Sequence, residues 1–289
     1  MNEVLIVGAG ISGLSTAALL TKQGIPVRIF EKANSVGGRT TSMVFKNHIL
    51  DNGFHIMPFY RTSAVYQILK EIGAVEQLQL SKVEKISFFR EQKFHKYPKG
   101  ILDIFGLSMV PFKSRIKLLQ VLLPMAFSSI KKSEELDSKS LTEITNKLDH
   151  KTKSFFEAVC MLAFADIPEH VSLGEFVRTI IRANPFKGGT SEFAYPSSGG
   201  YDEVSKIISS YVKNNGGKLM LKTPISKISV RDGKVKGVVT KTGEFFPSNC
   251  VVVSHPAYLA VNQFFDDGVF DKKFLSKVNR LNKIGRAHV

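Results

Sequence analysis

The chain lacks tryptophan and contains only two cysteines among its 289 residues. Cys160 and Cys250 lie far apart in apolar stretches, without the spacing of a disulfide framework or a metal site, which favours a reducing compartment. No apolar run is long enough to span a bilayer. The N-terminal apolar run has no basic leader and therefore does not resemble a signal peptide. These absences predict a cytoplasmic protein with no metal site.

Acidic residues are scarce, since 25 Asp and Glu stand against 40 Lys and Arg and give a formal net charge of +15. Nucleic acid is excluded as a partner, because neither a nucleic-acid-binding motif nor a basic cluster interleaved with aromatics accompanies the charge. Two interpretations stay open. In the first, the protein binds peripherally to the anionic inner face of a membrane. In the second, the chain is simply a basic soluble protein. Nothing in the sequence indicates an oligomeric state.

Glycines follow the first apolar run of the chain. Val4–Val7 is continuously apolar, as expected for a strand buried on both faces of a parallel sheet. Gly8 permits a tight turn, Gly10 lets a pyrophosphate approach the backbone, and Gly13 lets the next helix pack closely. The Ala- and Leu-rich stretch that follows predicts a helix over 12–23. The pattern is typical of a dinucleotide site.

The two ends of the predicted dinucleotide site have different chemistry. Ile11 and Ser12 stand at the helix start, where free N–H groups and the positive end of the helix dipole favour phosphate. A second apolar run, Val27–Phe30, ends in Glu31, whose carboxylate can accept hydrogen bonds from both ribose hydroxyls of an adenosine. Lys32 is assigned to the same site. These residues predict a bound adenosine diphosphate moiety.

A second glycine-rich turn identifies the dinucleotide. Gly37, Gly38, Arg39 and Thr40 follow Glu31 within one short loop. The glycines allow another close backbone approach, and the Arg fork suits phosphate. The stretch resembles the extended fingerprint of the flavin-dependent amine oxidase and desaturase superfamily. The resemblance implies that FAD is the cofactor; the alternative is a surface turn with a solvated arginine.

A third segment strengthens the resemblance. Asp51 and Asn52 precede Gly53, Phe54 and His55, which together are similar to an Asp-x-Gly-x-His segment of the same superfamily. In that family the segment passes near the isoalloxazine ring, so the last three residues are assigned to the cofactor site. A plain Asn-Gly turn is the competing interpretation.

The rest of the chain predicts an α/β protein with two interleaved lobes. A hairpin is expected over 86–97 and a three-stranded meander over 225–246, turning at Asp232 and Gly233, before a buried strand at 251–254. Helices are predicted over 112–131, 140–148, 151–164, 172–182 and 202–214.

The resemblance implies how these elements form lobes. A Rossmann-like FAD-binding lobe, with a parallel sheet and the meander, comprises 1–55 and 195–283, and an α+β substrate lobe comprises 56–194. In the superfamily, the position of Ile225 places its backbone at the adenine edge; in the simpler interpretation it is a buried strand residue. Gly199 and Gly200 match a glycine pair between the lobes, or simply start a helix.

The middle segment contains four stretches, 53–60, 65–72, 97–102 and 111–119, which within the superfamily look like phytoene and carotene desaturases and their hydroxysqualene-processing relatives. Residues 101–112 are densely apolar and precede Lys113, Arg115 and Lys117; residues 118–127 are apolar again. Apolar faces rimmed by cations suit an element in a bilayer interface, where a lipophilic substrate enters. Ordinary core helices with solvated lysines are the alternative.

The resemblance implies a redox mechanism carried by FAD, with hydride removed from an isoprenoid-like substrate. Amine oxidation and protoporphyrinogen oxidation remain alternatives within the superfamily, and a non-catalytic prenyl-binding escort protein is an alternative of another class. His55, His170 and His255 are the candidates for proton handling, but a structural role is favoured and no catalytic base is assigned.

The C-terminal end differs from the family pattern. The resemblance implies a further glycine-rich segment that completes the flavin seat, and the chain stops where that segment should begin. Residues 284–289 back-translate to a sequence that resembles a common sequencing adapter. We therefore expect that the native part of this sequence stops near Lys283, that the last six residues are not native, and that the protein is C-terminally truncated. A genuine short protein is the alternative.

Overall fold

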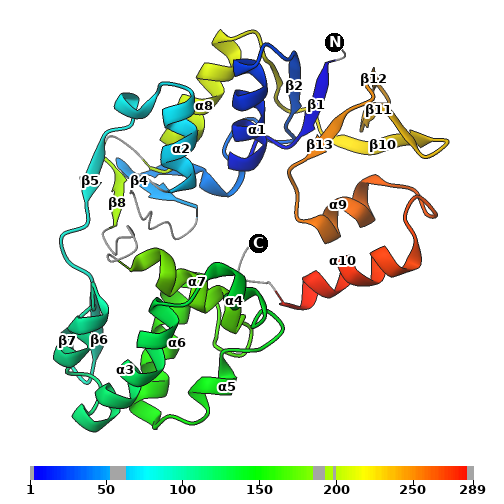
Figure 1. Ribbon diagram of the computed structural model, residues 1–289. Helices are drawn as coiled ribbons and strands as arrows, with labels where there is room; N and C mark the ends of the chain where they lie inside the picture. Colours follow the sequence, from blue (N-terminus) through cyan, green and yellow to red (C-terminus); the bar gives the residue numbers. More distant parts are fainter. Residues whose placement is uncertain (1–2, 53–62, 185–192, 198–199, 285–289) are drawn as a thin grey trace. The chain divides into compact units, whose positions relative to one another are not determined.

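The computed structural model describes residues 3–52, 63–184, 193–197 and 200–284 (Figure 1). The chain divides into two compact units. Unit 1 comprises Met1–Lys82 and Ala194–Asn279, and unit 2 comprises Val83–Phe193 and Arg280–Val289. Helix α2 (Ala64–Glu71) buries Leu69 in the core of unit 1. The predicted lobes, 1–55 with 195–283 and 56–194, stay a prediction.

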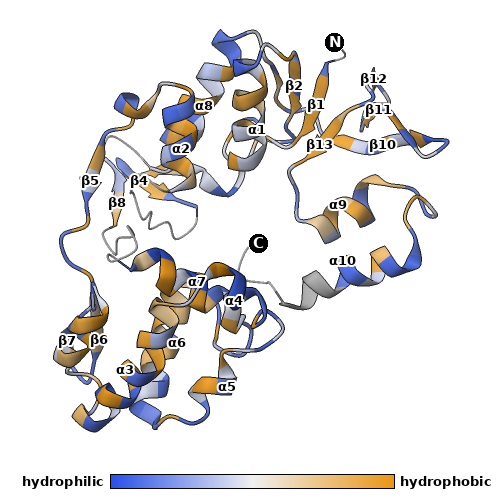
Figure 2. Ribbon diagram, viewed as in Figure 1, coloured by the Kyte–Doolittle hydropathy of each residue, from blue (hydrophilic) through white to orange (hydrophobic). Residues whose placement is uncertain are grey.

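Unit 1 is built on a parallel sheet of order β13-β1-β2-β9. Its strands are β1 (Val4–Val7), β2 (Val27–Phe30), β9 (Lys218–Met220) and β13 (Val251–Val253). Val4 and Ile6 face a core shared with helices α1 (Ile11–Lys22) and α8 (Asp202–Asn214), whereas Leu5 and Val7 face a second core. Both faces of β1 are therefore covered, which explains its unbroken apolar sequence and its colour in Figure 2.

The second core of unit 1 lies against the meander. The meander consists of strands β10 (Ile225–Arg231), β11 (Lys234–Thr240) and β12 (Phe245–Pro247). Helix α9 (Ala257–Phe264) packs beside β10. Asp232 and Gly233 both have positive φ, 53° and 68°, as the predicted type I′ turn requires. Phe30 of the parallel sheet contacts Phe246 of the meander edge to face, with ring centroids 4.8 Å apart.

Unit 1 also contains two strand pairs, two 3-10 turns and most of a C-terminal helix. They are the hairpin β3 (Ser42–Phe45) with β4 (His48–Asp51), the pair β5 (Leu80–Lys82) with β8 (Ala194–Pro196), the 3-10 turns Gly38–Thr40 and Val75–Gln77, and helix α10 (Lys272–Ile284), whose last residues belong to unit 2.

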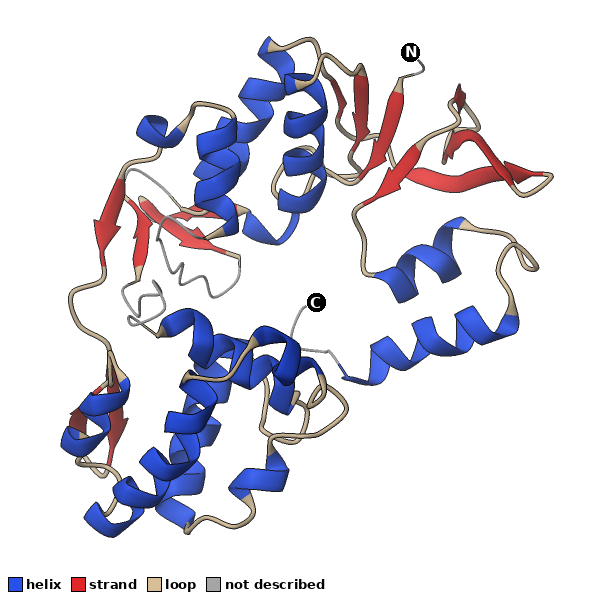
Figure 3. Ribbon diagram, viewed as in Figure 1, coloured by secondary structure: helices blue, strands red, loops and turns tan. Residues whose placement is uncertain are grey.

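Unit 2 is mainly helical, as Figure 3 shows for the part of the chain between β6 and α7. Its elements are the hairpin β6 (Ser87–Arg90) with β7 (Lys93–Lys96), the 3-10 helix η3 (Ile101–Gly106), and helices α3 (Phe112–Ala126), α4 (Ile130–Glu134), α5 (Thr142–Thr145), α6 (His150–Phe164) and α7 (Leu173–Ala183). Its core includes Leu118, Phe156 and Val177. Among the described residues, no helix is both long and apolar enough to cross a bilayer.

The expected helix over 112–131 is divided in two. Helix α3 ends at Ala126, two residues after Pro124, which has no N–H to donate to the preceding turn. A new helix begins after Ser129, whose hydroxyl accepts a hydrogen bond from the Lys132 N–H. The cap at Ser129 therefore starts α4 instead of continuing α3.

Candidate functional site

The first glycine turn joins β1 to α1 and is closely packed. Gly8 has φ +103°, and its N–H donates to Phe30 O over 2.8 Å. A Cβ added at Gly13 would lie 2.1 Å from Gly8 O, so only glycine lets α1 approach the turn this closely. Because Gly13 has no side chain, the start of α1 can lie beside the ends of β1 and β2.

The two glycine-rich turns meet. Gly10 and Gly37 form a parallel β-bridge, and the Gly37 N–H donates to Ala9 O over 2.9 Å. The first hydrogen bond of α1 runs from Leu14 N–H to Gly10 O, which leaves the N–H groups of the residues between them without partners inside the helix. The helix dipole is positive at this point, so the junction favours an anionic group held by backbone N–H donors.

Glu31 lies at the end of β2 and is buried, with 8% of its surface exposed. Its Oε2 accepts a hydrogen bond from the Ala9 N–H over 2.7 Å, and its Oε1 accepts one from the Ala33 N–H over 2.9 Å. Each carboxylate oxygen keeps a second acceptor position. The carboxylate therefore fixes the glycine turn and retains capacity for ligand hydroxyls. Lys32, beside it, is exposed.

The second turn holds its position through Thr40. The Thr40 hydroxyl donates to Gly37 O over 2.8 Å and lies 2.8 Å from the Ser205 hydroxyl of α8. The Arg39 side chain is exposed and has no hydrogen bond or ion pair with the residues that the structure describes. A guanidinium of this kind next to an anion-favouring junction is available for a phosphate.

Sequence reasoning missed the place of two residues beside Gly8. The Ser254 hydroxyl, just after β13, lies 3.1 Å from both Val7 O and Gly8 O, so it ties the last strand to the glycine turn. The His255 ring lies against Gly8, since a Cβ there would be 3.3 Å from its Cε1. Burial, together with the charge of Lys32, lowers the pKa of His255. The only sequence signal for these contacts was that Ser254 and His255 directly follow a predicted buried strand.

A third contact region surrounds Asp51. Its Oδ1 accepts hydrogen bonds from the Ser42 hydroxyl and from the Tyr201 N–H at the start of α8, the latter over 2.8 Å. A Cβ at Gly200 would lie 2.0 Å from Ser42 Oγ, which explains a glycine here. Asp51 thus caps α8 from another element.

Three other predictions have different outcomes. Gly53, Phe54 and His55 lie outside the described residues. Ile225 is buried at the start of β10 and packs in the core with the meander, as the simpler interpretation expects. The His170 Nδ1 lies 2.9 Å from Asp166 Oδ1 in unit 2, an ion pair or hydrogen bond at the surface.

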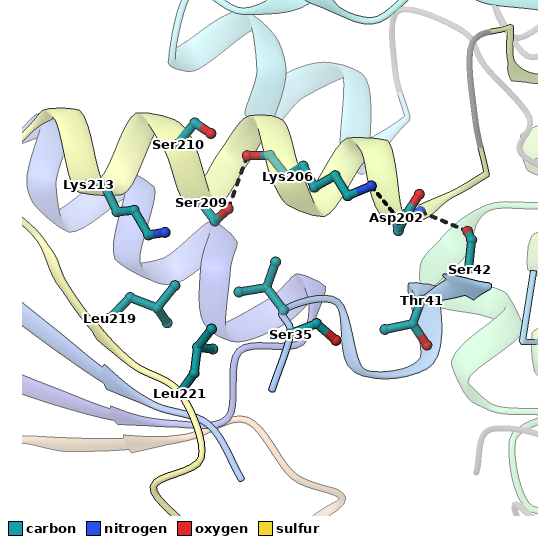
Figure 4. A pocket seen from close by; sticks show the side chains of 11 residues that line it. Ser35, Thr41, Ser42, Asp202, Lys206, Ser209, Ser210, Lys213, Leu219 and Leu221 are labelled. Atoms are coloured by element: carbon teal, nitrogen blue, oxygen red, sulfur yellow. Dashed lines mark hydrogen bonds and ion pairs between the residues drawn. The ribbon is translucent and has the colours of Figure 1, made fainter. Parts of the chain in front are cut away.

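A surface pocket of about 350 Å³ adjoins the second glycine turn (Figure 4). Figure 4 shows Lys213 extending from α8 toward the strand side, while Lys206 reaches Asp202, 2.6 Å away. The lining residues are Ser35, Val36, Thr41, Ser42, Asp202, Lys206, Ser209, Ser210, Lys213, Leu219 and Leu221. Neither the first glycine turn nor Glu31 is among them, so this pocket is distinct from the predicted cofactor site.

These groups fit the adenosine diphosphate part of FAD. A buried carboxylate suits ribose hydroxyls, and helix N–H groups with an available arginine suit a pyrophosphate. A Cβ at Gly10 has only Gly37 O nearby, at 4.0 Å, so the glycine leaves room for a ligand at this place. Among the described ranges, no group of three or more His, Cys, Asp or Glu is placed to hold a metal ion.

Comparison with known proteins gives the same cofactor. A family model described as "Flavin containing amine oxidoreductase" matches residues 11–282. A flavin-containing amine oxidase of Oncorhynchus mykiss is 24% identical over 292 residues, covering 91% of this chain and 52% of that protein. A phytoene desaturase of Phycomyces blakesleeanus is 23% identical over 282 residues, covering 87% and 47%. The chain spans about half the length of these curated relatives.

A solved structure shares the fold. The crystal structure of an oxidoreductase from Methanosarcina mazei superposes with a TM-score of 0.73 at 21% identity, covering 96% of this chain and 64% of that one. The likeness confirms the expected Rossmann-like α/β architecture. The family match extends over nearly the whole chain and confirms FAD as the cofactor. The resemblance found in the glycine turns is therefore correct, and the chain belongs to the family of flavin-containing amine oxidoreductases.

Proposed function

We propose that this chain provides the FAD-binding and substrate-facing parts of an oxidoreductase that removes hydride from a lipophilic, isoprenoid-like substrate. The observation that carries the proposal is the meeting of two glycine turns at the start of α1, beside buried Glu31. When bound, FAD supplies the redox chemistry. The chain supplies binding and orientation: Glu31 holds the adenosine ribose, and the α1 N-terminus with Arg39 holds the pyrophosphate.

The substrate class depends on other observations. The amine oxidase and phytoene desaturase relatives are equally distant, at 24% and 23% identity, and do not discriminate between substrates. Two features favour an isoprenoid-like molecule over an amine. The net charge of +15 repels cationic amines at long range, and unit 2 exposes apolar side chains such as Phe105 and Phe112.

The cofactor assignment is tested by titrating the purified chain with FAD, ADP and FMN. FMN lacks the adenosine that Glu31 is proposed to hold. We expect FAD and ADP to bind and FMN to bind more weakly, and Glu31→Gln to weaken FAD and ADP binding about tenfold without changing FMN binding. Glu71→Gln is the matched control, because that carboxylate pairs with Lys22 on the surface. Equal losses for FAD and FMN would contradict the role of Glu31.

The substrate class is tested separately by anaerobic reduction of the bound flavin. Phytoene in vesicles and a set of primary amines are offered in parallel, and loss of the visible flavin band is recorded. Bleaching by the isoprenoid alone supports the proposal, and bleaching by amines alone replaces it with amine oxidation. A folded chain that binds neither FAD nor ADP would favour the prenyl-binding escort alternative.

A further inference from the structure

Unit 2 exposes its large apolar side chains unevenly. In its residues 87–130, nine large apolar side chains are exposed, with Phe94 at 77% and Leu102 at 64%. In residues 131–184 only two such side chains, Met161 and Ile167, are exposed among those that the structure describes. Surface apolar residues scattered singly need no explanation, but a concentration of this kind marks an interaction surface.

Helix α3 gives this surface an ordered edge. Phe112, Ile116, Leu123 and Phe127 are 62%, 43%, 44% and 57% exposed. Their spacing of four, seven and four residues places them on one side of the helix. Leu118, Leu122 and Ala126 are buried on another side and hold α3 in the core of unit 2. The exposed stripe is therefore additional to the side that the fold requires.

Arg115 joins the neighbouring 3-10 helix to this stripe. Its Nε donates to Val110 O over 2.8 Å and its Nη1 donates to Phe105 O over 2.6 Å. Phe105, 50% exposed, is thereby held next to the start of α3, where the Arg115 guanidinium also lies 5.9 Å from the centroid of the Phe112 ring. The exposed apolar side chains of η3 and α3, together with Phe127 just after α3, are here called the α3 surface. They are Leu102, Phe105, Phe112, Ile116, Leu123 and Phe127.

Positive charge gathers in nearly the same part of the sequence, with the boundary after residue 132 instead of residue 130. Residues 83–132 contain ten Lys and Arg against three Asp and Glu, a net charge of +7. Residues 133–193 contain seven against ten, a net charge of −3. Lys113, Lys117, Lys131 and Lys132 are exposed and have no ion pair within the described part of the chain. Glu91, one of the three acids, is already paired with Arg90 and Lys151.

We infer that the α3 surface docks on an anionic lipid bilayer. Buried protein interfaces are depleted in lysine, whereas a bilayer interface takes apolar side chains and attracts lysine to its headgroups. Four exposed lysines, each within five residues of exposed Phe112 or Phe127 in the sequence, therefore favour the bilayer over a second copy of the chain or an apolar protein partner. The inference rests on the proposed function, because a lipophilic substrate dissolves in that bilayer.

The test is co-sedimentation of the full chain with vesicles, which needs neither flavin nor turnover. Vesicles of phosphatidylcholine alone are compared with vesicles that also contain phosphatidylglycerol. We expect the chain to bind the anionic vesicles, less tightly as salt rises. Lys113→Gln with Lys117→Gln should weaken binding about 25-fold, since each lysine contributes about fivefold near an anionic surface.

Apolar variants separate docking through the α3 surface from attraction by charge alone. Phe112→Ser with Phe127→Ser should abolish binding to anionic vesicles, and the matched control Met161→Ser with Ile167→Ser should not. All four side chains are exposed, so thermal unfolding of both variants should follow that of the parent. Equal losses in the two variants, or no binding by the parent, would overturn the inference.

A parent protein that is an oligomer, and that becomes a monomer only in the Phe112 variant, would assign the surface to a second copy instead. FAD titration remains unaffected in every case, which separates this outcome from failure of the proposed function.

Discussion

Replacing Gly10 by alanine separates ligand contact from fold stability. Gly10 has φ −71° and ψ 174°, an extended conformation open to any L-residue. The added Cβ would lie 4.0 Å from its nearest neighbour, Gly37 O, an ordinary van der Waals distance. The change therefore strains nothing in the protein itself. The methyl group would instead occupy the space through which we propose the pyrophosphate of FAD passes.

Gly13→Ala is the contrasting variant. Its Cβ would lie 2.1 Å from Gly8 O and 2.9 Å from Ser254 Oγ, and the first neighbour is backbone that cannot rotate away. Overpacking of this kind costs about 1–3 kcal/mol. For Gly10→Ala, reduced freedom of the unfolded chain contributes about 0.4–1 kcal/mol of stability, and the weaker N-cap offsets it by a similar amount.

The assays are urea unfolding and FAD titration of both variants. We expect Gly10→Ala to change the free energy of unfolding by less than about 1 kcal/mol and to weaken FAD binding at least tenfold, about 1.4 kcal/mol. Gly13→Ala should lose both stability and FAD. If Gly10→Ala binds FAD as the parent does, the proposed path of the pyrophosphate is wrong. If Gly13→Ala is as stable as the parent, the packing argument fails.

Two further predictions concern titratable groups. Because the pKa of His255 is lowered in the fold, protonation favours the unfolded chain, so stability should fall as pH drops below about 6.5, the ordinary value for histidine. Urea unfolding of His255→Phe should show a flatter pH profile, and an unchanged profile would contradict the burial argument. Burial raises the pKa of Cys160 to about 12, whereas Cys250 is exposed. A thiol reagent at neutral pH should therefore label one cysteine in the native chain and both in urea, and Cys250→Ser should abolish native labelling.

Local pattern was enough to predict the strand, turn and helix that carry the proposed cofactor site. The run Val4–Val7 followed by Gly8, Gly10 and Gly13 predicted a strand, a turn and a helix, because buried parallel strands are continuously apolar and only glycine permits the close turn. The meander was predicted from a different local signal, the Asp232-Gly233 pair, which suits a type I′ turn between antiparallel strands. The division of the expected helix 112–131 at Ser129 was not predicted, because the apolar spacing continued through the residue whose hydroxyl caps α4.

Contacts between distant segments were beyond the sequence. Asp51 was expected to lie near the flavin ring, but its carboxylate also caps α8 through the Tyr201 N–H, 150 residues away. Ser254 fixes the Gly8 turn across 246 residues. Neither distance appears in any local pattern, because each depends on which strands become neighbours.

The sequence by itself determined the nucleotide-binding elements and the flavin family, since the geometry of a glycine turn is set by residues within one turn of chain. Tertiary structure decided what those residues do for the fold. Glu31 was predicted as a ribose ligand, which stays a prediction, and the structure shows its carboxylate accepting a hydrogen bond from the Ala9 N–H. Tertiary structure likewise decided which apolar side chains of 87–130 stay exposed. Burial depends on what packs against each side of a helix, and the local sequence pattern of that helix does not say which segments those are.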